Sequence, residues 1–499
     1  MDVSMTRPPR RTWIIGAAVV AVVALVAGAI GFSLRPSIDG ETAGGPAATV
    51  APPKTVVQVG QLEPAPPGAQ ASGWETEWAS LLDIRLVAQL DSSGPDAWDA
   101  AAHPDVYVSA QGPGYGSSAF GGAFLSQAQV GPGVAIIDAR THEAVASTEY
   151  LVDGIDTYPE NHGLAVSPDG KWLYTQGVSQ ESSLSGKAVT NVINARTMKV
   201  DKVILSRMHH GKVIHNAFTD KDLVLIEGWG TFFALDPADD NRVVGAVDPK
   251  DLAGAGYLGF ADPSGKWLLI SVRTGFQESD GGIAVVSLED WKVKARINTL
   301  DGSPIWVAFS ADGKTAYVSD GHESKIAKLD ISAENPSEWE LVGLANAGTV
   351  GPYGLTLSWD DQMIFSIGKG EASHNQGKTI GFTTSDLFVP PDKYRGWGTT
   401  LGEIVTNCLR GDHAIVNPDR ELNEMWESCN SSFDNVIVDM GTQTVTAVIP
   451  QPNGGSSHNG AFVRYTAEWI GELLSDTNGF HGSALAVKLA AVASATASK

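Results

Sequence analysis

The stretch ENHGLAVSPDGKWLYTQG, Glu160–Gly177, contains the pattern that decides the fold. LAV and KWLYT have the composition of two short strands. SPDG between them is typical of a tight turn, because Pro168 presets φ and Gly170 tolerates a positive φ. The stretch therefore predicts an antiparallel hairpin. It also places a titratable ring, His162, where the first strand begins.

The same hairpin recurs along the chain at intervals of roughly 40 to 60 residues, a range typical of propeller blades and solenoids. The clearest copies are LGFADPSGKWLLIS (Leu258–Ser271), VAFSADGKTAYVS (Val307–Ser319), LTLSWDDQMIFS (Leu355–Ser366) and AIVNPDRELNEMWES (Ala414–Ser428). A second hairpin follows, as in GIAVVSLEDWKVKARI, Gly282–Ile297. Four antiparallel strands in each repeat, without a convincing helix, indicate an all-β propeller.

The first and last repeats complete each other in this pattern. The first, around DVYVSAQG (Asp105–Gly112), has no clear first strand, and the last begins with HNGAFVRY (His458–Tyr465) but has no four-strand set after it. A ring closes if the C-terminal segment supplies the missing strand, and closure removes unpaired sheet edges. We therefore predict a seven-bladed β-propeller. Eight blades are the alternative, if Trp469–Val487 forms a blade of its own.

The N-terminal region contains an apolar run that is long enough to cross a membrane. Trp13–Phe32 is uncharged and spans about 20 residues, the length a bilayer requires. Arg7, Arg10 and Arg11 precede it and favour a cytoplasmic N-terminus. We predict an uncleaved anchor in the cell membrane, with the propeller on the extracytoplasmic side; a cleaved signal is the alternative. The predicted regions are a cytoplasmic tail (1–12), a transmembrane signal anchor (13–33), a disordered Pro/Ala/Gly-rich linker (34–75), the propeller (76–490) and a disordered tail (491–499).

The net charge and the two cysteines indicate which partners and which cellular compartment suit this chain. The formal net charge of −23 argues against nucleic acid as a partner. Cys408 and Cys429 flank the turn at Pro418 and Asp419 almost symmetrically, so a hairpin there would bring them together. In an oxidising compartment we expect a disulfide between them, and two free buried thiols are the alternative.

Histidines and aromatic residues share the positions where the first strands begin. The first strand of a propeller blade lies innermost, so these positions should meet at one mouth of the central channel, with the SPDG-type turns at the other mouth. The predicted metal ligands are His162, His215, His413 and His458, and the predicted cofactor contacts are Tyr257, Trp306 and Tyr353. Neutral imidazole binds copper, zinc, iron and nickel, and it is an axial ligand of haem. The sequence favours copper or haem, while a purely structural role of these histidines is the alternative.

Several of the quoted segments also resemble a known group of propellers. PDGKWLYT, SADGKTAYVSDG and DARTHEAVAS are similar to YVTN-type repeats, whose superfamily includes the d1-haem propeller of cytochrome cd1 nitrite reductase. The segment His413–Tyr465 is similar to the closing blades of that group, and the resemblance covers most of residues 100–465. It implies the propeller fold and one iron-ligating histidine at the channel mouth. The cytochrome c domain of the nitrite reductases has no counterpart here, so the resemblance does not imply nitrite reduction.

Three functions stay open at this point. The first is an extracytoplasmic propeller that binds a metal or haem-type cofactor through the histidines and is redox-linked. The second is a non-catalytic propeller that binds a protein or glycan partner. The third is a metal-dependent, lactonase-like hydrolase, for which Glu160 and Asp412 are the carboxylates near the histidines.

Overall fold

The computed structural model describes most of the chain from residue 55 to residue 497. The described residues are 55–60, 76–112, 133–152, 157–179, 187–207, 216–218, 222–228, 230–273, 281–298, 303–321, 324–347, 351–369, 378–383, 400–408, 410–430, 432, 434–452 and 456–497. All of them belong to one compact unit, residues 47–499.

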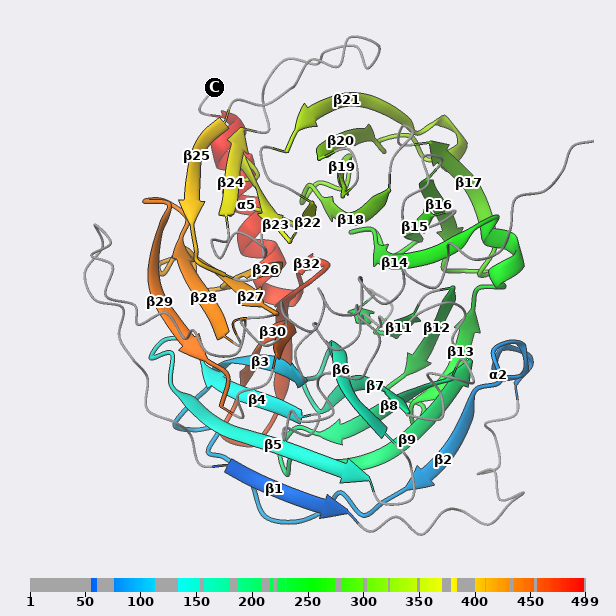
Figure 1. The fold of residues 1–499 in the computed structure, drawn as a ribbon, viewed down its shortest axis with the longest axis vertical. Coiled ribbons are helices and arrows are strands. Elements are labelled where there is room, and N and C mark those ends of the chain that lie inside the picture. The colour runs from blue at the N-terminus through cyan, green and yellow to red at the C-terminus, as the bar shows by residue number, and fades with distance from the viewer. Residues whose placement is uncertain are drawn as a thin grey trace, which may run out of the picture. The chain divides into compact units, whose positions relative to one another are not determined.

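The described strands form seven sheets, which Figure 1 shows arranged around a central axis. Five of these sheets have four consecutive strands each. They are β10 (Asn216–Phe218), β11 (Val224–Gly228), β12 (Thr231–Asp236) and β13 (Arg242–Ala246); β14 (Ala255–Ala261), β15 (Trp267–Arg273), β16 (Gly282–Ser287) and β17 (Val293–Asn298); β18 (Pro304–Phe309), β19 (Thr315–Asp320), β20 (Lys325–Asp330) and β21 (Glu340–Asn346); β22 (Pro352–Leu357), β23 (Met363–Gly368), β24 (Lys378–Thr383) and β25 (Thr400–Val405); and β26 (Gly411–Val416), β27 (Glu424–Cys429), β28 (Asp434–Asp439) and β29 (Thr444–Pro450).

The other two sheets have the same four-stranded unit with additions at their edges. One consists of β6 (Thr157–Val166), β7 (Trp172–Ser179), β8 (Lys187–Asn194), β9 (Lys199–Arg207) and the added outer strand β2 (Arg85–Gln89). The other runs in the order β1 (Thr55–Gly60), β5 (Ala144–Val152), β4 (Gly133–Asp138), β3 (Asp105–Gly112), β30 (Ser456–Tyr465), β31 (Gly471–Asp476) and β32 (Gly479–Phe480). The helical segments among the described residues are α2 (Glu77–Leu81), η1 (Pro249–Leu252), η2 (Pro336–Glu338) and α5 (Gly482–Ala497).

The ring closes in the way that the repeat pattern predicts. The inner strands β6, β10, β14, β18, β22, β26 and β30 contact one another in this order, and β30 contacts β6. The C-terminal strand β30 pairs with β3, with Asp105 opposite Arg464. This pairing confirms that the C-terminal segment supplies the strand that the first repeat lacks.

The hairpin that opens the sequence pattern is also present. β6 and β7 pair in antiparallel orientation. Gly170 has a φ of +67°, and its N–H donates to the Ser167 carbonyl at 2.8 Å. The Ser167 hydroxyl binds Asp169 at 2.6 Å, which stabilises the turn through its side chains as well. The core lies between the sheets: Leu269, Val307 and Leu355, from three successive sheets, are buried in one cluster.

Three predictions about the ends of the propeller are wrong. Trp469–Val487 does not form an eighth blade, because β31 and β32 extend the sheet of β30 and α5 follows them. The predicted disordered tail is helical as far as Ala497. Within the predicted disordered linker, β1 pairs in parallel with β5, since the outer edge of a sheet offers unpaired backbone groups.

The predicted transmembrane anchor, residues 13–33, lies outside the described residues. Among the residues that the structure describes, no helix is long and apolar enough to cross a membrane.

Candidate functional site

The inner strands share an irregularity close to their first residues. In five sheets, two consecutive residues of the inner strand have no partner on the neighbouring strand, while the residues on either side of them are paired. The first unpaired residues are Tyr257, Ile305, Tyr353, Asp412 and His458, and the second are Leu258, Trp306, Gly354, His413 and Asn459. Such bulges redirect side chains and are frequent beside functional sites. We call this end of the ring the start mouth and the opposite end, where the hairpin turns lie, the turn mouth.

The bulges correct one detail of the sequence interpretation. The repeat pattern treats His413 as the equivalent of Tyr257, Tyr353 and His458. In the structure Asp412 occupies that position, and His413 is the equivalent of Trp306. Counting back from the hairpin turn gives the same alignment, because His413 precedes Asn417 by four residues just as Trp306 precedes Ser310.

Four of the predicted site residues meet at the start mouth. The hydroxyls of Tyr257 and Tyr353 lie 2.7 Å apart and are hydrogen-bonded. The ring of His413 lies edge-on to Trp306, with 4.3 Å between ring centroids, and stacks with Tyr353 at 5.8 Å. The exposed fractions of the four residues are between 0 and 4%. Aromatic rings from three inner strands and one imidazole therefore form a buried polar-aromatic layer.

Two basic residues that the sequence interpretation did not select lie against this layer. The guanidinium carbon of Arg273 lies 3.9 Å from the centroid of the Tyr257 ring, and Lys369 Nζ lies 3.7 Å from that of Tyr353. Lys369 Nζ also forms an ion pair with Asp412 Oδ1 at 2.8 Å. Arg273 ends β15 and Lys369 directly follows β23, but the equivalent positions in two other sheets are Gly321 and Asn430, so the repeat alignment does not indicate a basic residue there. We call Tyr257, Tyr353, Trp306, His413, Arg273, Lys369 and Asp412 the start-mouth cluster.

Burial changes the protonation of two members of this cluster. Burial lowers the pKa of Lys369 to about 8, although the nearby Asp412 carboxylate opposes this change. Burial also lowers the pKa of His413, against the opposing effects of Asp412 and Asn459. At neutral pH His413 is therefore a neutral imidazole, while Lys369 is mostly charged but can lose its proton in a mildly alkaline solution.

The other predicted histidines are placed by their backbone alone or not at all. His162 lies in β6 and His458 lies in β30, and these inner strands are neighbours. The Asn459 amide donates to the Leu164 carbonyl at 3.1 Å, which ties the two strands together near both histidines. The side chains of His162 and His458 are not described, and His215 lies outside the described residues.

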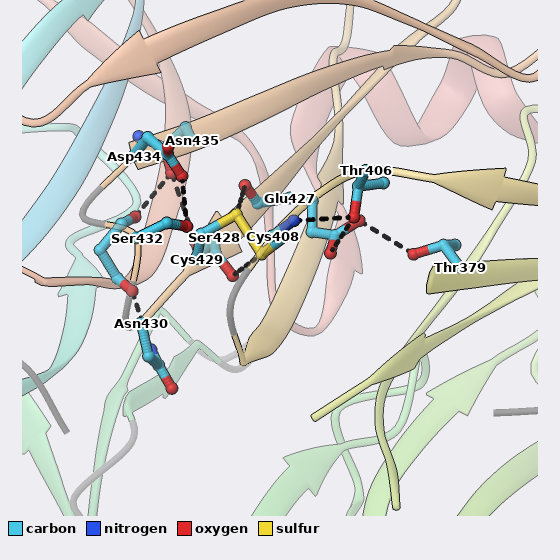
Figure 2. The surroundings of a disulfide bond; sticks show 11 residues. Thr379, Thr406, Cys408, Glu427, Ser428, Cys429, Asn430, Ser432, Asp434 and Asn435 are labelled. Atoms are coloured by element: carbon cyan, nitrogen blue, oxygen red, sulfur yellow. Dashed lines mark hydrogen bonds between the residues drawn. A yellow bond between two sulfur atoms is a disulfide. The ribbon is translucent and has the colours of Figure 1, made fainter. Parts of the chain in front are cut away.

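The predicted disulfide is confirmed. Cys408 and Cys429 are bonded, with 5.2 Å between their Cα atoms, and β26 and β27 form the predicted hairpin between them. Figure 2 shows Glu427 beside the disulfide, where its carboxylate accepts hydrogen bonds from Thr379 at 2.9 Å and from Thr406 at 3.4 Å. In the described part of the chain, these two cysteines and Glu427 are the one group of three potential metal ligands in mutual reach. Because the two sulfurs are bonded to each other, this group is not a metal site.

The turn mouth is covered by the C-terminal segment, and a cavity of about 280 Å³ lies there. Its walls include Ala308 and Val416 of the inner strands, together with Asp476, His481 and Lys488 of the covering segment. His481 Nε2 and Asp476 Oδ1 are 2.7 Å apart. Lys488 Nζ donates to the Ser358 carbonyl at 2.7 Å, which fixes helix α5 to the ring.

Comparison with known proteins supports the fold and no closer relationship. No family model matches this chain, and no curated protein matches it. The periplasmic gluconolactonase PpgL of Pseudomonas aeruginosa matches with a TM-score of 0.51 and 14% identity, over 72% of this chain and 99% of that one. A Bacteroides fragilis structure provisionally assigned as a 6-phosphogluconolactonase matches with a TM-score of 0.50 and 14% identity, over 72% and 98% of the two chains. The dihydro-haem d1 dehydrogenase NirN matches over 83% of both chains with 15% identity, but its TM-score of 0.45 is too low to support an argument. At these identities the likeness shows a β-propeller fold alone.

Proposed function

We propose that this chain is a seven-bladed propeller, one blade for each sheet, that binds a small organic ligand at its start mouth. The observation that carries the proposal is the convergence of Tyr257, Tyr353, Trp306 and His413 from four different inner strands. Buried hydroxyls and imidazoles are costly to desolvate, and a propeller core does not require them. Aromatic walls with a few convergent polar groups and a residue of perturbed pKa are typical of small-molecule sites.

A metal or haem-type cofactor is the second candidate, with His162 and His458 as its ligands. These residues lie in the neighbouring inner strands β6 and β30, which favours this candidate. His413 fits a metal less well, because its ring packs against Trp306 and the nearby Lys369 ammonium would repel a metal cation. Copper or haem chemistry at this mouth therefore depends on the other histidines. His162 and His458 would hold copper or haem iron through a neutral imidazole nitrogen.

The remaining alternatives differ in what they need from the start mouth. A lactonase-like activity, which the names of two structural neighbours suggest, would need a carboxylate that activates water. Asp412 is the described candidate, but it is fully buried and paired with Lys369. A partner-binding propeller would use the loops around the start mouth and would not need the buried cluster. The cluster thus favours a small-molecule site over both alternatives.

We place this site outside the cytoplasm, held at the cell membrane by residues 13–33. The disulfide between Cys408 and Cys429 supports this placement, because disulfides persist in oxidising compartments. The apolar run Trp13–Phe32 with its basic flank supports the anchor.

Thermal unfolding of the purified protein with gluconate, glucono-δ-lactone, haemin and copper(II) tests the proposal. A ligand that binds the folded state alone raises the midpoint, by roughly 2–4 °C if binding contributes about 1–2 kcal/mol. The shift should disappear in Trp306→Ala and remain in Trp339→Ala, a buried tryptophan outside the start-mouth cluster that pairs with Trp267. A shift that persists in Trp306→Ala would contradict a ligand at the start mouth. Haemin or copper binding that depends on His162 and His458 would favour the second candidate.

A further inference from the structure

The cavity at the turn mouth lies between the ring and the C-terminal segment. Its volume of about 280 Å³ exceeds the roughly 150 Å³ that holds a benzene molecule inside a protein. Three inner strands leave this space because each carries an alanine in the wall: Ala261 of β14, Ala308 of β18 and Ala414 of β26. The cavity can therefore accommodate one aromatic ring with a short substituent.

The segment that covers the cavity is not needed to close the propeller. The pairing of β30 with β3 completes the ring, and β31, β32 and α5 follow it in the chain. Phe480 of β32 lines the cavity together with Phe309 of β18, and the Phe480 ring packs on Trp359, with 4.4 Å between ring centroids. Aromatic side chains around a cavity favour an apolar ligand, because its burial removes apolar surface from water.

One carboxylate of the cavity wall has an oxygen that can accept a hydrogen bond from a ligand. Asp476 is 7% exposed, and its Oδ1 accepts from the Asn478 backbone N–H at 2.8 Å. His481 Nε2 lies 2.7 Å from the same Oδ1. Among the residues that the structure describes, none donates to Asp476 Oδ2. A buried carboxylate oxygen is costly to leave without a donor, so this atom favours a ligand that has one.

Two other buried charges of the wall are already paired within the protein. Asp262 accepts hydrogen bonds from the backbone of its own hairpin turn, from Lys266 at 3.0 Å and from Trp267 at 2.8 Å. Lys488 Nζ forms its ion pair with Asp361 at 2.6 Å. Among these three buried groups, Asp476 is therefore the one that can select a ligand through a hydrogen bond.

We propose that the turn-mouth cavity is a second binding site, which takes a small aromatic molecule that carries one hydroxyl group. The aromatic ring packs on Phe309 and Phe480, and the hydroxyl donates to Asp476 Oδ2. A hydrogen bond to an ionised acceptor is roughly twice as strong as one between neutral groups, so the carboxylate distinguishes a phenol from an ether of similar size. The site lies at the opposite mouth from the start-mouth cluster and does not depend on the proposed function.

Calorimetric titration of the full chain with phenol, and with anisole as the analogue without a donor, tests this inference. We expect phenol to bind about tenfold or more tightly than anisole, since only phenol makes the charge-assisted hydrogen bond. Asp476→Asn should remove this preference, because the asparagine oxygen stays with Asn478 and His481 and its amide N–H groups replace the acceptor. Ala308→Leu should abolish the binding of both compounds, since the larger side chain occupies the cavity.

Asp138→Asn is the matched control for the loss of the carboxylate. Asp138 is also 7% exposed and lies 2.8 Å from a histidine, His103, but outside the cavity, so this variant should keep the preference for phenol. Circular dichroism and thermal unfolding identify variants that do not fold, and Asp476→Asn decides the question if Ala308→Leu is among them. Equal affinities for phenol and anisole, no phenol binding, or an unchanged preference in Asp476→Asn would overturn the inference. Phenol binding that is lost in Trp306→Ala and kept in Asp476→Asn would place the ligand at the start mouth and would overturn it as well.

Discussion

Lys369 Nζ and Asp412 Oδ1 lie 2.8 Å apart and join two neighbouring sheets at the start mouth. Asp412 has no exposed surface, and the Lys369 side chain keeps 11% of its surface exposed. Removal of either side chain would therefore leave the charge of the other buried and uncompensated.

The buried Lys369 should make the free energy of unfolding rise between about pH 8 and pH 10.5. Its folded pKa of about 8 lies below the unfolded value of 10.5, so in this window the unfolded chain binds a proton that the folded chain does not. Lys369 therefore lowers the free energy of unfolding by its full amount below about pH 8, and this destabilisation disappears as the pH approaches 10.5. Its size is at most about 3 kcal/mol, because one pKa unit corresponds to about 1.4 kcal/mol.

Urea unfolding at several pH values checks this prediction. The double variant Lys369→Met with Asp412→Asn removes both charges and is the control. Between about pH 8 and pH 10.5, the unfolding free energy of the natural chain should rise relative to that of this variant. Two curves that stay parallel would show that Lys369 does not titrate as its burial implies.

The disulfide should contribute about 2–4 kcal/mol to stability, the usual range for a bond that restricts the unfolded chain. Cys408 and Cys429 are separated by 21 residues and are both buried. The double variant Cys408→Ser with Cys429→Ser should lower the free energy of urea unfolding by this amount. Thiol titration of the denatured, unreduced protein should detect almost no free thiol, and two free thiols per chain would disprove the bond.

Helix α5 should depend on one buried ion pair for its attachment to the ring. Lys488 Nζ lies 2.6 Å from Asp361 Oδ1, and their side chains are 5% and 9% exposed. Lys488→Met should destabilise the protein by about 3–5 kcal/mol, because the Asp361 carboxylate stays buried without its partner. Adding Asp361→Asn should restore much of the loss, since Asn also tolerates the φ of 55° at this position.

Limited proteolysis gives an independent measurement of the same attachment. Cleavage in residues 482–497 should be faster in Lys488→Met than in the natural chain or the double variant. Equal cleavage rates in all three proteins would show that the ion pair does not hold the helix.

The mature protein should keep its N-terminus. N-terminal sequencing of the membrane fraction should begin at or near Met1, because Trp13–Phe32 is longer than a usual signal-peptide core. A sequence that begins after about residue 35 would show that the apolar segment is cleaved and that it is not a permanent anchor. Recovery of the protein in the aqueous fraction would agree with that second result.

The sequence-based predictions succeeded where the information is local or repeated. The turn around Gly170 is encoded by the residues that form it, and the same turn chemistry recurs in each copy of the hairpin. The pairing of Cys408 with Cys429 follows from the same hairpin geometry. The convergence of Tyr257, Trp306 and Tyr353 at one mouth was also predictable, because the starts of successive inner strands surround one axis.

The positions that were missed depend on contacts between distant segments. Arg273 and Lys369 appear in the sequence as ordinary basic residues near the ends of strands. Their role depends on the tyrosine rings of the preceding strands and on Asp412 in the next sheet. Helix α5 has a composition of small residues that does not indicate a buried face, and it becomes ordered by packing across the turn mouth.

By itself the sequence determined the propeller fold of this protein, the closing strand β30 and the disulfide, because the same turn chemistry and strand alternation recur at intervals of roughly 40 to 60 residues. The tertiary structure alone decided which residues face one another at the start mouth. Asp412 meets Lys369 of the neighbouring sheet, and His413 meets Trp306, although these residues come from different inner strands or sheets. Such contacts between side chains of different sheets exist only after the sheets have assembled.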